Sequence, residues 1–139
     1  MSRYLFSGVV AALLLAAGSV QAHHSFAAEF DANKPITLKG IVTKIEWTNP
    51  HVWFYVNVKD EKTGEVVNWG AEMGPPHGLQ RRGWRRDTLK IGEEVTVEGS
   101  MAKNGSKRMN ARTVTLTSTG GRPGETLDAV SSGGANSNQ

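Results

Sequence analysis

The chain has 139 residues, a formal net charge of +3 and no cysteine. This length leaves room for one domain. The lack of cysteine excludes disulfide bonds, a thiolate nucleophile and cysteine-ligated metal centres, so the domain must depend on its hydrophobic core.

Residues 1–22 have the parts of a cleavable secretory signal peptide. Arg3 supplies a short positive segment, residues 4–17 are largely apolar, and residues 20–22 (Val-Gln-Ala) suit a cleavage site. The alternative is an uncleaved membrane anchor, but the apolar run is shorter than the roughly 20 residues that span a bilayer. The sequence therefore predicts cleavage after Ala22, a periplasmic or secreted protein, and no membrane span after cleavage.

The dominant hydrophobic period in the body of the chain is two, which is typical of β-strands. We predict an N-terminal arm over residues 23–35 and a folded domain over residues 36–117. This order of elements predicts an all-β fold, a small five-stranded OB-like barrel with one short helix between its third and fourth strands. An open sandwich or another small barrel is the alternative. The predicted strands are residues 36–48, 51–59, 65–71, 93–102 and 110–117, and the predicted helix is residues 76–82.

Two further features of the chain depend on composition and parity. In the first strand the apolar residues change parity at Gly40, with Leu38 before it and Ile41 after it, which predicts a bulge or bend at the glycine. Residues 118–139 are rich in Ser, Gly, Thr and Asn, and a segment with so few apolar groups is predicted to be disordered.

Three motifs resemble those of a family of small exported bacterial proteins of unknown function. They are residues 23–26 (His-His-Ser-Phe), residues 47–51 (Trp-Thr-Asn-Pro-His) and residues 82–84 (Arg-Gly-Trp). The resemblance covers nearly the whole mature domain, residues 23–117. It implies an exported protein with an OB-like layout, and it brings no activity, substrate or catalytic residue.

The regular alternation of residues 51–59 predicts an aromatic face. If the apolar partners fill the barrel, His51, Trp53 and Tyr55 point outward, where rings can stack on sugars, bases or partner side chains. Arginines of the third-to-fourth-strand connection can hold an anionic group by paired hydrogen bonds. The alternatives are that the rings pack as a second small core and that the arginines form a solvated surface. The predicted ligand-binding residues are Trp47, His51, Trp53, Tyr55, Trp69, Arg82 and Arg85.

A second candidate site is the mature N-terminus. Cleavage after Ala22 would give His23 a free α-amine beside its imidazole, and His24, His51 or His77 can add another nitrogen. Such nitrogen ligands suit Cu(II), and the set resembles the histidine brace of copper proteins. The alternative is a solvated pair of histidines with no metal role.

We therefore predict a non-enzymatic exported module that recognises a periplasmic protein, a glycan or a small ligand. A copper-binding protein that uses His23, His24 and His51 is the alternative. Export argues against nucleic acid as the partner, and no Ser/His/Asp arrangement of a hydrolase is visible. No catalytic residue is predicted.

Overall fold

The computed structural model describes residues 27–117 and 124–130. The predicted signal peptide, His23 and His24 lie outside the described residues. Residues 27–29 are helical and lead into the first strand. The remaining elements are β1 (Phe30–Glu46), β2 (Trp53–Lys59), β3 (Val66–Glu72), α3 (Pro76–Arg81), β4 (Glu94–Ala102), β5 (Arg108–Leu116) and β6 (Thr126–Asp128).

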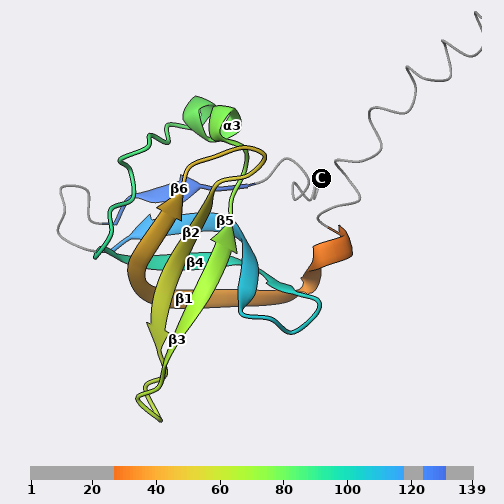
Figure 1. The fold of residues 1–139 in the computed structure, drawn as a ribbon, viewed down its shortest axis with the longest axis vertical. Coiled ribbons are helices and arrows are strands. Elements are labelled where there is room, and N and C mark those ends of the chain that lie inside the picture. Colours follow the sequence, from red (N-terminus) through yellow and green to blue (C-terminus); the bar gives the residue numbers. More distant parts are fainter. Residues whose placement is uncertain (1–26, 118–123, 131–139) are drawn as a thin grey trace, which may run out of the picture.

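The first five strands form a closed barrel (Figure 1). β1 pairs antiparallel with both β2 and β4, β3 pairs with β2, and β5 pairs with β4. A parallel pairing of β3 with β5 closes the ring. Together with α3 between β3 and β4, this arrangement confirms the predicted five-stranded OB-like barrel.

β1 serves two sides of the barrel, but it bends later than predicted. Its first part pairs with β4 as far as Ile41, and its second part pairs with β2 from Ile41 to Glu46. The register shifts between Val42 and Lys44 and not at Gly40. Gly40 has a different role, because a Cβ there would lie 2.5 Å from the Asn57 carbonyl oxygen. The glycine permits close packing of two strands, and the bulge follows it.

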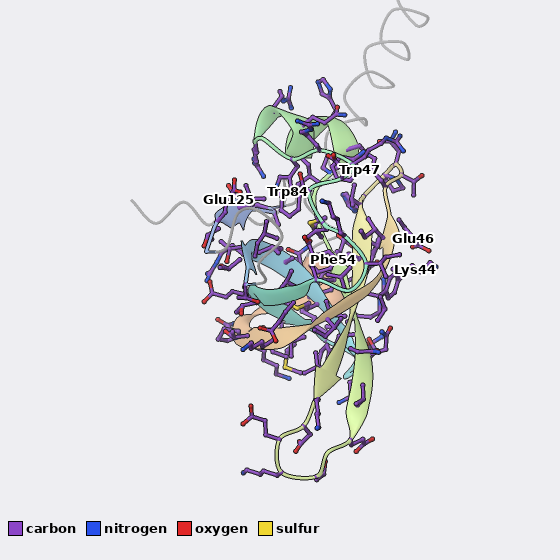
Figure 2. All side chains as sticks on the ribbon, turned by 90° about the vertical axis from the view of Figure 1, so that its left-hand side faces the viewer. Lys44, Glu46, Trp47, Phe54, Trp84 and Glu125 are labelled. Atoms are coloured by element: carbon purple, nitrogen blue, oxygen red, sulfur yellow. The ribbon has the colours of Figure 1, made fainter. Side chains whose placement is uncertain are left out.

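The inward side chains of the barrel form one hydrophobic core. Val52, Phe54 and Val56 are completely buried, as the alternation of β2 predicts. α3 lies over one end of the barrel (Figure 1), where Leu79 and Trp84 are buried against the same core. Figure 2 shows Phe54 within the barrel and Trp84 beneath the helix.

The C-terminal segment, residues 124–130, corrects the prediction of a disordered tail. β6 pairs antiparallel with β5, and Ala129 is fully buried. β3 and β6 occupy successive parts of one edge of β5, at residues 108–110 and 113–115. Composition predicted disorder because polar residues dominate the tail. The open edge of β5 offers backbone partners that composition cannot reveal.

Candidate functional site

The candidate site lies on the outer face of β2, β3 and β5. Trp53 and Tyr55 reach this face because the alternate residues of β2 fill the barrel. The surface is hollowed into a shallow pocket of about 430 Å³, which we call the outer-face pocket. It is lined by Glu46, Trp53, Tyr55, Asn68, Gly70, Lys107 and Arg108.

Gly70 makes room for the two aromatic rings. It pairs with Tyr55 in the β2–β3 register. A Cβ on Gly70 would lie 3.2 Å from Tyr55 Cε1 and 3.5 Å from Trp53 Cζ3. The missing side chain therefore lets both rings lean over β3, where they form one wall of the pocket.

Cations lie over both rings. The Arg108 guanidinium carbon is 4.6 Å from the centroid of the Trp53 ring, and Lys44 Nζ is 5.2 Å from that of Tyr55. Both distances fall within the range of cation–π attraction. Arg108 takes part in no ion pair among the described residues. No carboxylate of the described residues therefore fixes the stacked guanidinium, which lines the pocket.

Glu46 gives the same pocket an acidic side. Lys44 forms an ion pair with Glu46, and the Tyr55 hydroxyl donates to Glu46 Oε2 at 3.2 Å. The Lys44 ammonium lowers the pKa of the Glu46 carboxyl, while burial and the bond to Glu46 raise the pKa of Tyr55. Lys44 and Glu46 project from the same side of the barrel (Figure 2). Glu46 is therefore ionised at neutral pH, and it lines the same pocket as Lys107 and Arg108.

A buried carboxyl adjoins the aromatic wall. Glu72 pairs with Trp53 across the strands and is only 8% exposed. Its Oε1 lies 3.2 Å from His51 Nδ1 and accepts a long, 3.5 Å hydrogen bond from Asn110 Nδ2. Burial and then the Glu29 carboxylate raise the pKa of Glu72 to about 7, against the opposing charge of Arg108. Sequence reasoning missed Glu72, although a carboxyl between apolar Ala71 and Met73 was an available signal.

The structure separates two predicted tryptophans from the aromatic face. Trp69 points into the barrel, because its partner in the β2–β3 register is the buried Val56. It is 7% exposed, and Lys107 Nζ lies 5.2 Å from its ring centroid. Trp47 is half-buried and packs against the core. Of the predicted tryptophans, Trp53 lines the pocket.

The arginines at the pocket are not those predicted. Arg82 contacts the C-terminal segment, and Arg85 pairs with Asp87 at 3.4 Å. Lys107 and Arg108 supply the positive charge instead. They follow the turn between β4 and β5, and the parallel β3–β5 pairing places Arg108 beside Gly70. The sequence motif did not indicate Lys107 and Arg108, because the closure that brings them to the pocket is not local.

The profile of a family of unknown function, DUF6152, matches residues 11–111 of the chain. The chain belongs to this family. The DUF6152 match includes every residue that lines the outer-face pocket, and it confirms the resemblance to a family of unknown function. No curated protein matches the chain.

A solved structure also resembles this DUF6152 chain. It is the crystal structure of the ZRD-deleted mutant of TiaS in complex with agmatine. The two share 21% sequence identity with a TM-score of 0.46, over 71% of this chain and 27% of that chain. The chain thus spans about a quarter of the length of that structure.

The predicted copper ligands of this DUF6152 chain are only partly visible. His51 is half-buried beside Glu72, whereas His23 and His24 lie outside the described residues. Within residues 27–117 and 124–130, no three His, Asp or Glu side chains form a group that could hold a metal ion. In the same ranges no helix is long and apolar enough to cross a membrane.

Proposed function

We propose that the chain is an exported, non-enzymatic binding module that holds a carboxylate-bearing small molecule or glycan in the outer-face pocket. The observation that carries this proposal is the Arg108 guanidinium, stacked 4.6 Å above Trp53 at the pocket wall. A guanidinium held in one plane by an aromatic ring is prepared to give two parallel hydrogen bonds to a carboxylate.

Because cations already cover the rings of Trp53 and Tyr55, the pocket favours an anionic ligand over a ligand that stacks on these rings. Arg108 and Lys44 already lie over Trp53 and Tyr55, so a sugar or base would have to displace a cation. An anion gains from Arg108 and Lys107 and needs no such displacement. Glu46 lines the same pocket, and its carboxylate can accept hydrogen bonds from hydroxyl or amino groups of the same ligand. This combination suits an acidic sugar or a hydroxy acid.

The size and place of the pocket also support a binding role. A volume of about 430 Å³ lies within the roughly 300–1,000 Å³ of small-molecule sites. OB-type barrels bind oligomeric ligands on the face of strands two and three, next to the connecting loops. The pocket occupies that face. The export part of the proposal depends on the signal-peptide pattern of residues 1–22.

Calorimetric titration of the mature protein tests the proposal. The probes are trigalacturonate, citrate and the neutral maltotriose, and ¹⁵N NMR follows the Trp53 indole N–H. Trigalacturonate is the glycan arm and citrate the small-molecule arm. We expect at least one acidic probe to bind, to shift this resonance and to weaken as salt is added.

The matched control compares two arginines. Arg108→Gln should weaken binding of the acidic probe at least tenfold, whereas Arg85→Gln, outside the pocket, should leave it unchanged. If neither acidic probe binds, if maltotriose binds as well as the acids, or if Arg108→Gln has no effect, the anion-binding proposal is wrong.

One geometric observation favours copper binding as a second candidate function. His51 Nδ1 contacts Glu72 Oε1, so the other ring nitrogen of His51, Nε2, is the atom available to a metal. Glu29 acts on the pKa of Glu72, so the N-terminal arm passes near His51. His23 is six residues before Glu29, a separation of at most about 20 Å in an extended chain. His23, His24 and His51 would then supply the nitrogen ligands.

Competition titration with Cu(II) and a chelator of known affinity tests this second function. The mature protein that starts at His23 should bind one copper tightly. Adding one alanine before His23, or replacing His51 with Gln, should each weaken binding at least a hundredfold. Equal copper affinity in the alanine-extended protein would exclude a site built on the N-terminal amine.

A further inference from the structure

The barrel has a seam between β3 and β5 that only part of β3 closes. β3 pairs with β5 at residues 108–110, and β6 continues along the same edge at residues 113–115. Figure 1 shows β6 beside β5 at the end of the barrel that α3 covers. The C-terminal segment therefore fills the half of the seam that β3 leaves open.

Backbone hydrogen bonds hold the C-terminal segment in place. The Gly124 amide donates to the Leu116 carbonyl at 2.7 Å, and the Ala129 amide donates to the Arg112 carbonyl at 2.8 Å. The Gly74 amide donates to the Ala129 carbonyl at 3.0 Å. Such contacts depend on an extended backbone and little on side-chain identity, which is the mode of recognition by β-strand addition.

Two side chains of the barrel bind further backbone carbonyls of the segment, and two other features add sequence preference. The Trp84 indole donates to the Asp128 carbonyl at 2.8 Å, and Arg82 Nη1 donates to the Val130 carbonyl at 2.6 Å. Arg82 Nε also lies 4.0 Å from the Asp128 carboxylate. Ala129 is fully buried in the hydrophobic core, where a larger side chain would overpack its neighbours. The seam thus selects an acidic residue followed by a small one.

Two arginines near the C-terminal segment, residues 124–130, form no ion pair with it. Arg81 and Arg86 are exposed, and neither takes part in an ion pair among the described residues. Arg82, which follows Arg81 at the end of α3, binds the Val130 carbonyl, so this end of the segment lies beside α3. The sequence after Val130 reads Ser-Ser-Gly-Gly and contains no acid. An extended peptide with acidic residues after the position of Val130 would add attractions that the resident segment lacks.

We propose that this seam is a strand-addition site for an extended acidic peptide of a partner protein. The chain's own residues 124–130 occupy the site until such a peptide displaces them. The partner segment has an acid and a small residue in the positions of Asp128 and Ala129, followed by further acids. This inference is independent of the outer-face pocket.

The proposal is tested by cutting the chain between β5 and the C-terminal segment, so that the segment can leave but no residue of the domain is deleted. A specific protease site is placed within residues 118–123, and fluorescein-labelled peptides are added before and after cleavage. The probes are Gly-Glu-Thr-Leu-Asp-Ala-Val-Glu-Glu, the same peptide ending in Ser-Ser, and the Glu-Glu peptide with tryptophan at the alanine position. Fluorescence anisotropy measures binding, and native mass spectrometry follows loss of the cleaved segment.

We expect the cleaved protein to bind the Glu-Glu peptide as its own segment leaves. The Ser-Ser peptide should bind at least threefold more weakly, and the tryptophan peptide should not bind. In the uncleaved protein binding should be at least tenfold weaker, because a tethered segment competes at millimolar effective concentration.

Two matched substitutions separate the charge argument from a general loss of structure. Arg81→Gln with Arg86→Gln should reduce binding of the Glu-Glu peptide to that of the Ser-Ser peptide, and should leave the latter unchanged. If the cleaved protein unfolds, if the tryptophan peptide binds equally well, or if labelled peptide never replaces the segment, residues 124–130 are a permanent part of the barrel and the inference is wrong.

Discussion

Two tryptophan–arginine pairs in this barrel have opposite surroundings. Arg108 stacks on a half-buried Trp53 at the outer-face pocket. Trp84 is only 1% exposed, and it and Arg82 both donate hydrogen bonds to backbone carbonyls of the C-terminal segment. The residue types are the same, but in one pair the polar groups are already used by the fold. A tryptophan beside an arginine therefore indicates a ligand site only where its surroundings leave the arginine accessible.

The largest difference between the two pairs should appear in stability. Trp84→Ala removes a buried ring and should lower the free energy of unfolding by about 3–5 kcal/mol. Trp53→Ala removes a partly exposed ring and should cost less than about 1.5 kcal/mol. Urea unfolding followed by circular dichroism measures both. Equal losses would mean that Trp53 is also a core residue and would remove the distinction.

The carboxyl beside Trp53 should make stability depend on pH. The pKa of Glu72 is raised from 4.5 in the reference state to about 7 in the fold. Between these values the folded state holds a proton that the unfolded state has lost, so stability falls as pH rises through this window. The effect is on the order of 3 kcal/mol. The groups that face the carboxyl are His51, Glu29, Arg108 and Asn110.

The variant Glu72→Gln should abolish this pH dependence. At pH 8 it should be more stable than the parent by about 3 kcal/mol, and near pH 4 the two should be equal. Thermal unfolding across pH 4–8 measures the difference. A parent protein whose stability rises over this range would show that Glu72 is instead stabilised as the anion.

The smallest expected effect is the difference in stability between variants of Arg82 and Arg108. Arg82→Gln removes a charged hydrogen bond to the C-terminal segment and should cost about 1 kcal/mol of stability. Arg108→Gln should cost about 0.5 kcal/mol, because it removes a single exposed cation–π contact. Urea unfolding of both variants makes the comparison. A larger loss from Arg108→Gln would assign that arginine to the fold and weaken the case for a binding pocket.

Local pattern predicted most of the strands of this protein and missed features that depend on register. The period-two alternation located β2 and identified Val52, Phe54 and Val56 as core. The same alternation could not orient Trp69, because only the pairing with Val56 sets which face of β3 points inward. A one-residue change of register reverses every side chain on a strand, so aromatic content alone overestimated the outer face.

The sequence predicted only some of the residues of the candidate site. Trp53 and Tyr55 were placed on the correct face, but Lys107, Arg108 and Glu72 were not anticipated. These residues reach the site through the closure of β3 onto β5, between segments distant in sequence. The order of elements suggested a closed barrel, yet it could not specify the register of that closure.

By itself the sequence determined the OB-like order of strands, the core face of β2 and the family to which the chain belongs, because these depend on local periodicity and on motifs. Only the tertiary structure decided which tryptophans face solvent, which arginines remain accessible, and that residues 124–130 pair with β5. The physical reason is that exposure and pairing are properties of the assembled sheet, where each edge and each face takes its partners from distant parts of the chain.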